Sequence, residues 1–354
     1  MHVTVCIPAY NASRTLRRTL DSILSQDYPD FDVLVCDNSS TDNTAEIVRG
    51  YSDRGVRYFL NPVRTQWAES NWNHALPLAA GPLIALYHAD DIYTPTMVRR
   101  EAEFLSMHPE ASSVFTMTQV IDHMDRPVRI GSTRLPVELR GQDLFDFETL
   151  FNAVLRHNNF MTVPTLMTRR ETIDAVGVFD PQRFESAADI DLWLRMARWR
   201  PVGIIDEPLH RYRVSPHQES ARIYRLRTHL GHFYWVLDHY LSRPEIGEIV
   251  QPQAEAIYRM ERSRDHTIFA MNLVVTGRVD EAQARLQEAV NWGCFATSMQ
   301  RPRRLPMLLA GFGLLLAIRL GLSKPAGGLM YAAYKWCSRW RRQPLRVQCK
   351  PKAG

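Results

Sequence analysis

Cysteine is scarce and scattered in this sequence. Its 354 residues include five cysteines, none of them in a CxxC pair: Cys6, Cys36, Cys294, Cys337 and Cys349. Disulfide-stapled domains and structural zinc sites need paired or closely spaced cysteines. Both classes are therefore disfavoured, and the reducing cytosol is the expected location.

The sequence also lacks a secretory signal, and its composition is that of an ordinary globular protein. Residues 1–8 lack the basic and apolar regions of a signal peptide and predict a buried strand instead. Hydrophobic residues make up 45% of the chain and charged residues 23%, which excludes disordered and collagen-like proteins. The length allows two or three compact units.

Acidic residues are absent from the C-terminal end. No Asp or Glu follows Glu288, whereas twelve basic residues do: Arg301, Arg303, Arg304, Arg319, Lys324, Lys335, Arg339, Arg341, Arg342, Arg346, Lys350 and Lys352. The formal net charge of the whole chain is +5, so the part before this tail is net acidic. A basic tail on an acidic body indicates a separate function for the tail.

Apolar runs alternate with helical patterns over the first 120 residues. The sequence predicts strands at 3–8, 31–36, 56–60 and 83–87, and helices at 14–26, 42–51, 68–80 and 95–107. This rhythm predicts an α/β fold with a doubly wound, mixed but mainly parallel sheet and helices on both faces. Further strands, at 112–120, 202–205 and 209–212, complete a domain that we place at residues 1–215.

Strand patterns disappear beyond Ser220. Apolar side chains at helical spacing predict a helical extension over residues 216–300, with helices at 222–240, 253–275 and 279–292. In the tail, residues 301–354, an uncharged run of fourteen residues at 305–318 is shorter than the roughly 20 that a spanning helix needs. Flanking basic and aromatic residues predict helices that lie in a membrane interface, and a buried helical hairpin is the alternative.

No glycine-rich phosphate motif follows the first predicted strand. That strand runs into Pro8, Ala9, Tyr10 and Asn11, without the GxGxxG of dinucleotide-binding domains. A Walker lysine motif is missing as well. Rossmann oxidoreductases and P-loop enzymes are therefore disfavoured.

Carboxylates stand where predicted strands end. Asp37 ends the second strand, and Asp90 and Asp91 end the fourth. The carboxyl ends of parallel strands open on one crevice, so these side chains converge there. Adjacent carboxylates repel one another unless they share a cation, so a divalent metal, Mg²⁺ or Mn²⁺, is the expected cofactor. Asp42 precedes a helical pattern directly and is predicted to cap that helix.

Three segments together resemble the family 2 glycosyltransferases, whose fold is called GT-A. They are residues 3–11, 36–42 and 89–95, which match that family in order and spacing, and the resemblance covers roughly residues 1–215. It implies a nucleotide-sugar donor, whose base is held by Pro8, Ala9, Tyr10 and Asp37, with Asn11 as a further donor-binding residue. It also implies that Asp90 faces the ribose and that Asp91 carries the metal on the diphosphate. His88 stands where many members have an acidic residue.

A third acidic cluster supplies a candidate general base. Glu185, Asp189 and Asp191 surround the start of a predicted helix. By the resemblance, Asp189 deprotonates the acceptor hydroxyl, and Asp191 is the reserve candidate. The alternative is a capping box formed by Ser186 and Asp189.

Two residues at and after the last predicted strand are candidate ligands. Arg213 carries a permanent charge and is predicted to bind the donor phosphate. His217 lies near the position where the family usually has a histidine, so it is a candidate metal or phosphate ligand.

Together these features predict an inverting, metal-assisted glycosyltransferase that acts on a glycan or a lipid-linked saccharide. We expect the acceptor to contact loops near residues 122–140 and 151–162. The expected location is the cytoplasmic side, peripheral on the inner face of the cell membrane, with anionic lipid as a partner and nucleic acid excluded. A non-catalytic nucleotide-sugar-binding scaffold and a nucleotidyltransferase are the alternatives.

Overall fold

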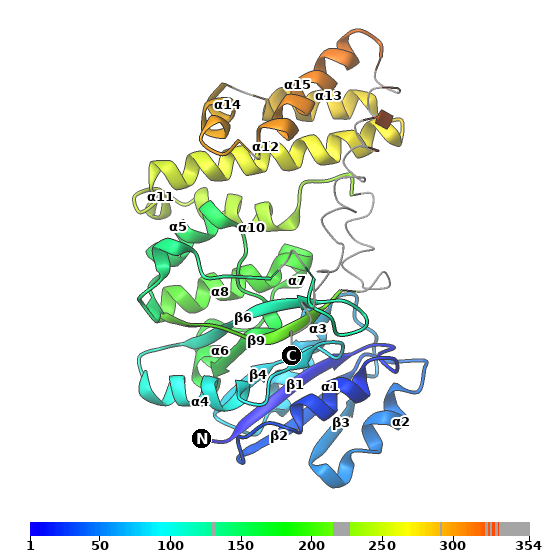
Figure 1. Cartoon of the computed structure of the whole chain (residues 1–354), viewed down its shortest axis with the longest axis vertical. Helices are drawn as coiled ribbons and strands as arrows, with labels where there is room; N and C mark the ends of the chain where they lie inside the picture. Colours follow the sequence, from blue (N-terminus) through cyan, green and yellow to red (C-terminus); the bar gives the residue numbers. More distant parts are fainter. Residues whose placement is uncertain are drawn as a thin grey trace, which may run out of the picture.

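The structure is a computed structural model that describes residues 1–128, 132–214, 227–290, 292–302 and 304–322, together with residues 325, 328, 329 and 332. A sheet with helices packed on it forms one end of the molecule (Figure 1). A group of helices around one long helix forms the other end. These two parts correspond to the α/β and helical regions that the sequence predicts.

The first half of the sheet is parallel. Within the described residues the strands form one nine-stranded sheet in the order β3-β2-β1-β4-β8-β6-β9-β5, with β7 beside β9. The parallel strands are β1 (Val3–Ala9), β2 (Phe31–Asp37), β3 (Val56–Leu60) and β4 (Leu83–Leu86). Between them lie α1 (Leu16–Ile23), α2 (Thr44–Arg49), η1 (Ser52–Arg54), α3 (Ala68–Ala75) and η2 (Leu76–Leu78). The βα alternation predicted for this half is confirmed.

The second half of the sheet mixes both directions. Its strands are β5 (Ile92–Tyr93), β6 (Ser113–Ile121), β7 (Leu144–Phe145), β8 (Leu166–Arg169) and β9 (Val202–Arg213). β8 lies antiparallel between β4 and β6, while β6 and β9 are parallel. The two strands predicted at 202–205 and 209–212 are one strand, β9. The predicted parallel character therefore applies to β1–β4, and antiparallel pairing replaces it around β8.

Helices cover both faces of the sheet because successive side chains of a strand point to opposite sides. In β1, Val5 and Ile7 belong to one apolar cluster and Cys6 to the other. The remaining helices of this domain are α4 (Met97–Met107), η3 (Val137–Leu139), α5 (Phe147–His157), η4 (Val163–Thr165), α6 (Arg170–Val176), α7 (Pro181–Phe184), η5 (Glu185–Ala187) and α8 (Ala188–Trp199). Helices α1, α2 and α4 cover one face, and α3, α5 and α8 cover the other.

A helical extension packs against α5 and α8. Its first helices are α10 (His232–Leu241), α11 (Pro244–Gly247), α12 (Pro252–Val275), α13 (Val279–Ala289) and α14 (Trp292–Met299). The side chain of Asn152 on α5 donates to the carbonyl oxygen of Ile249 at 2.9 Å and accepts from the N–H of Gln251 at 2.8 Å. Buried polar contacts therefore join the extension to the α/β domain. The helix predicted at 222–240 is described only from residue 227 and begins at His232.

The last long helix that the structure describes, α15 (Leu305–Arg319), belongs to this extension. Its side chains Leu308, Leu314 and Ile318 are buried against α12, α13 and α14. Helix α15 therefore packs on the extension, and the predicted boundary at residue 301 stays a prediction. On its outer face, Leu309 is 50% exposed and Leu316 is 59% exposed. Among the described residues, no helix combines the length and the apolar character needed to cross a bilayer.

Candidate functional site

The ends of β1 and β2 form one edge of the site. Ala9 lies opposite Asp37 in the parallel register. Beyond the strand, the backbone N–H of Asn11 donates to Oγ of Ser40 at 2.9 Å, which ties the two loops together. The structure therefore brings residues 8–11 and Asp37 to one place, which we call the β1–β2 edge. Their predicted contact with a nucleotide base stays a prediction.

Asp37 is held rigidly at this edge. Its Oδ1 accepts from the backbone N–H of Ser40 at 2.9 Å, and its Oδ2 accepts from the hydroxyl of Tyr58 at 2.8 Å. Burial and the hydrogen bond to Asp37 raise the pKa of Tyr58 to about 12, so this hydroxyl keeps its proton. The Asp37 carboxylate is therefore fixed in orientation by two donors.

A cationic side chain that was not predicted from the sequence, that of Arg64, packs on the ring of Tyr10. The guanidinium of Arg64 lies 4.0 Å from the centre of the Tyr10 ring, and Tyr10 as a residue is 38% exposed. Arg64 comes from the loop after β3, so only the pairing of β1, β2 and β3 brings it here. The β1–β2 edge thus presents a positive charge beside an aromatic face.

Asp42 has the structural role that the sequence predicts. Its carboxylate accepts from the backbone N–H of Thr44, the first residue of α2, at 3.0 Å. It also accepts from the N–H of Ser13 at 3.1 Å. Burial alone would raise the pKa of Asp42, but these hydrogen bonds hold the pKa below its ordinary value.

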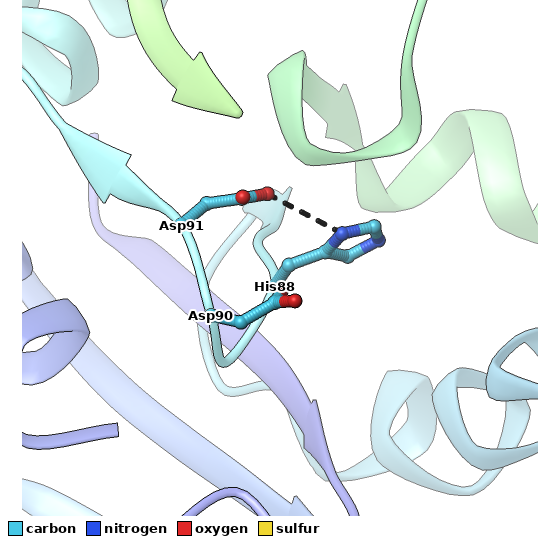
Figure 2. A group of neighbouring side chains, drawn as sticks. All are labelled: His88, Asp90 and Asp91. Atoms are coloured by element: carbon cyan, nitrogen blue, oxygen red, sulfur yellow. Dashed lines mark ion pairs between the residues drawn. The ribbon is translucent and has the colours of Figure 1, made fainter. Parts of the chain in front are cut away.

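Three candidate metal ligands gather on the loop between β4 and β5, which we call the 88–91 loop (Figure 2). One ligand atom each from His88, Asp90 and Asp91 lies within 4.8 Å of the others. His88 and Asp90 are half-buried, whereas Asp91 is completely buried. Carboxylate oxygens with one imidazole nitrogen suit Mg²⁺ or Mn²⁺. The donor atoms of this loop therefore fit a divalent cation.

Asp91 is engaged within the protein, and its predicted role as metal ligand stays a prediction. Its Oδ1 accepts from the backbone N–H of Arg213 at 2.8 Å, and its Oδ2 lies 2.9 Å from Nε2 of His210. Burial alone would raise the pKa of Asp91, but the imidazoles of His210 and His88 hold it below its ordinary value. Both oxygens of Asp91 are engaged inside the protein, so Asp90 is the partly exposed carboxylate of the pair. Sequence reasoning assigned no role to His210, because nothing local to β9 reveals its distant partner.

Arg213 is also engaged within the protein. This residue is 3% exposed, its Nε donates to the carbonyl oxygen of Asp90 at 2.8 Å, and its guanidinium pairs with the carboxylate of Asp125. Arg213 therefore supports the 88–91 loop from inside the protein, and its predicted binding of the donor phosphate stays a prediction. The other predicted ligand, His217, lies outside the described residues.

Asp189 begins α8 on the side that faces the 88–91 loop. Its carboxylate is half-buried and accepts from the N–H of Ile190 at 2.8 Å. Burial raises the pKa of Asp189 to about 6, although the N–H of Ile190 and the nearby charge of His88 act to lower it. A carboxylate with a pKa near neutrality is suited to accepting a proton. Its role as general base stays a prediction.

The reserve candidate, Asp191, is engaged elsewhere. It is buried, with its carboxylate accepting from Nε of Arg195 at 2.8 Å and from the hydroxyl of Tyr240 at 3.2 Å. Asp191 therefore joins α8 to α10 and is not placed to act as a base. The capping box is also not formed, because Ser186 Oγ lies 2.9 Å from Nδ1 of His232 instead.

Comparison with known proteins places this site in a family. The family model described as "Glycosyl transferase family 2" matches residues 4–177. The Bacillus subtilis (strain 168) protein named "Putative glycosyltransferase EpsE" is 32% identical over 199 residues, 54% of this chain and 66% of that protein. The Escherichia coli protein named "UDP-Glc:alpha-D-GlcNAc-diphosphoundecaprenol beta-1,3-glucosyltransferase WfgD" is 36% identical over 91 residues, 26% of this chain and 36% of that protein. The matched segments thus span about two thirds or less of these relatives.

Solved structures agree in fold over nearly the whole chain. Residues 1–349 of S. aureus TarS, solved alone and in complex with UDP-GlcNAc, are 17% and 16% identical with a TM-score of 0.56. The alignment covers 95% of this chain and 92% of that one. The mannosyltransferase PcManGT from Pyrobaculum calidifontis, in complex with GDP-Man and Mn²⁺, is 19% identical with a TM-score of 0.53, covering 94% of this chain and 86% of that one. Since the family match over residues 4–177 contains the β1–β2 edge and the 88–91 loop, the chain belongs to glycosyltransferase family 2.

Proposed function

We propose that the chain is an inverting glycosyltransferase that moves a sugar from a nucleotide-diphosphate sugar to a hydroxyl group of a saccharide or lipid-linked saccharide. The observation that carries the proposal is the closeness of two unlike groups: Asp189, whose pKa is raised to about 6, and the 88–91 loop, whose His88 charge acts on it. The UDP-GlcNAc complex of TarS supports a nucleotide-sugar donor. The name of WfgD supports a lipid-linked acceptor.

The donor would lie across the β1–β2 edge and the 88–91 loop. Pro8, Ala9, Tyr10, Asn11 and Asp37 would hold the nucleotide base. His88 and Asp90 would face the diphosphate and hold a divalent cation, with Asp91 fixing the loop beneath them. A bound cation neutralises the negative charge of the departing diphosphate, and the Mn²⁺ complex of PcManGT supports such a cofactor.

Asp189 would supply the base. Its carboxylate takes the proton of the acceptor hydroxyl while that oxygen forms a bond to the anomeric carbon. The bond between the anomeric carbon and the diphosphate oxygen breaks in the same step, and its electron pair leaves with the nucleoside diphosphate. Attack from the face opposite the leaving group inverts the configuration, through a transition state with oxocarbenium character.

We assign catalysis to residues 1–215 and treat residues 216–300 together with α15 as one helical extension. The C-terminal part would attach the protein to the inner face of the cell membrane. Two features support this attachment: the twelve basic residues after Glu288, and the exposed leucines 309, 316 and 320 on and just beyond α15. Anionic lipid attracts basic residues, and exposed leucines add an apolar contribution.

A panel of nucleotide sugars tests the proposal. Each donor is incubated with Mn²⁺ or Mg²⁺ and with a set of hexopyranosides that includes a diphospho-lipid saccharide, and release of nucleoside diphosphate is measured. We expect donor-dependent release, a product of inverted anomeric configuration by NMR, and loss of release in Asp189→Asn with donor binding retained. Pyrophosphate release would indicate a nucleotidyltransferase instead, and donor binding without any release would indicate a non-catalytic scaffold.

A further inference from the structure

Four aromatic rings meet where α3 and α10 begin, and we call them the aromatic wall. They are Trp67, His229, His232 and Trp235. The imidazoles of His229 and His232 stack with centres 4.7 Å apart at 7°. The Trp235 ring lies 4.5 Å from that of His232, and the Trp67 ring meets His232 edge-on at 6.3 Å. The wall thus joins the residue before α3, in the α/β domain, to the start of the helical extension.

His232 connects the aromatic wall to the turn that carries the proposed base. Its Nε2 lies 3.2 Å from Oε2 of Glu185, and its Nδ1 lies 2.9 Å from Oγ of Ser186. Glu185 has a φ of 49°, a left-handed conformation that a non-glycine residue adopts only where its surroundings hold it. The two partners precede Asp189 by four and three residues. The aromatic wall therefore stands directly beside the start of α8.

Helix α3 connects the same wall to the 88–91 loop. Trp72, five residues after Trp67 on this helix, stacks on His88 with ring centres 5.3 Å apart at 24°. Five helical residues correspond to about 7.5 Å along the axis. Helix α3 therefore links the aromatic wall to the proposed metal loop through Trp72, and His232 links the wall to the turn before the proposed base. An acceptor whose hydroxyl reaches Asp189 would extend past this turn.

The exposure of the rings suits a sugar. Trp67, His229 and Trp235 are each partly exposed, whereas His232 is buried behind them. Small-molecule sites are lined mainly by apolar and aromatic side chains, with a few polar groups that fix orientation. The C–H face of a pyranose ring packs on such aromatic surfaces. The half-exposed carboxylate of Glu185 lies beside His232 and can accept a hydrogen bond from a sugar hydroxyl.

We propose that the aromatic wall is the acceptor subsite, where Trp67 and Trp235 pack against the pyranose ring whose hydroxyl Asp189 deprotonates. This inference rests on the proposed glycosyltransferase function. It assigns the acceptor to the junction between the α/β domain and the helical extension, and thereby gives the extension a part in substrate recognition.

The test uses the acceptor that the nucleotide-sugar panel identifies and compares tryptophan variants. We expect Trp67→Ala and Trp235→Ala each to raise the acceptor KM at least tenfold, with the dissociation constant of the donor changed less than twofold. Trp67→Phe and Trp235→Phe keep an aromatic face and should stay within about threefold of the parent. Trp199→Ala is the matched control, because Trp199 is also partly exposed and bears an arginine 4.2 Å from its ring, but lies at the far end of α8.

The outcomes separate this inference from the proposed function. A chain that transfers no sugar contradicts the proposed function. Transfer with an unchanged acceptor KM in both alanine variants overturns the acceptor subsite alone. If the alanine variants weaken donor binding as much as acceptor binding, the rings only stabilise the fold. That result would also overturn the acceptor subsite. If Trp67→Ala does not fold, Trp235→Ala and the two phenylalanine variants decide the question.

Discussion

Nε2 of His210 lies 2.9 Å from Oδ2 of Asp91, and neither side chain has any exposed surface. On the other side of the same imidazole, Nδ1 lies 3.0 Å from Oγ1 of Thr118 on β6. His210 on β9 thus fixes the 88–91 loop to the middle of the sheet. Two adjacent carboxylates, Asp90 and Asp91, consequently have different environments: Asp91 is completely buried, and Asp90 is partly exposed.

Asp91→Asn should destabilise the protein by about 2 kcal/mol, because it removes charge from two buried hydrogen bonds. Urea denaturation measures the change. His210→Gln should cost a similar amount, and the double variant should cost less than the sum of the two because the residues share one interaction. If Asp91→Asn keeps its full stability but loses Mn²⁺-dependent donor binding, Asp91 is a metal ligand and not only a structural residue.

Asp90→Asn should show the opposite pattern. The carboxylate is partly exposed, so the free energy of unfolding should change little, while the affinity for a nucleotide sugar in Mn²⁺ should fall at least tenfold. Calorimetry with and without Mn²⁺ measures this difference. Glu103→Gln, which removes an exposed carboxylate from α4, is the control for charge alone. If donor affinity depends equally on Mn²⁺ in Asp90→Asn and in the parent, the assignment of Asp90 as a metal ligand is contradicted.

The transfer rate should depend on the protonation of Asp189. Only the carboxylate accepts a proton, so the rate should be full above about pH 6 and fall below it. Asp189→Asn should slow transfer about a hundredfold or more. Because the raised pKa means that ionisation is less favourable in the folded protein, the same change should increase stability at pH 7 by about 1–3 kcal/mol. A pH–rate profile and urea denaturation test the two effects.

Asp191→Asn is the matched control for this prediction. It weakens the contacts of Asp191 with Arg195 and Tyr240, so stability should fall, whereas the acid limb of the pH–rate profile should keep its midpoint. If Asp191→Asn abolishes transfer and Asp189→Asn does not, the base has been assigned to the wrong carboxylate.

Membrane attachment should depend on both charge and the outer face of α15. Removal of residues 323–354 deletes eight of the twelve basic residues and leaves α15 in place. We expect this truncation, and separately the combined Leu309→Ser, Leu316→Ser and Leu320→Ser change, to reduce co-flotation with anionic vesicles. High salt should release the parent protein only partly, because the apolar contribution persists.

Val137→Ser, at an even more exposed apolar position on η3, should not alter flotation. A full-length protein that ignores anionic vesicles at low salt would contradict the attachment. Removal of residues 301–354 is a poorer test, because it takes away Leu314 and Ile318 and uncovers the core of the helical extension.

The parallel half of the fold was predictable from sequence because its signals are local. The strands β1–β4 are mainly apolar segments separated by helical periodicity, and β3 occupies the predicted residues 56–60. β5, β7 and β8 went unpredicted because they are two to four residues long. Such short strands exist only through pairing with partners far away in the sequence, as β8 pairs with β4 and β6.

The sequence by itself determined which chemical groups meet in the crevice, because acidic residues at the ends of parallel strands must open on one edge. Only the tertiary structure decided which members of each cluster are exposed. Asp90 and Asp91 are neighbours in sequence, but β9 buries one of them. Asp189 and Asp191 differ by two helical positions, about 200° around the axis, so Asp189 stays partly exposed while Asp191 faces Tyr240. Burial of a side chain depends on elements that pack against it from elsewhere in the chain, and the local sequence does not identify those elements.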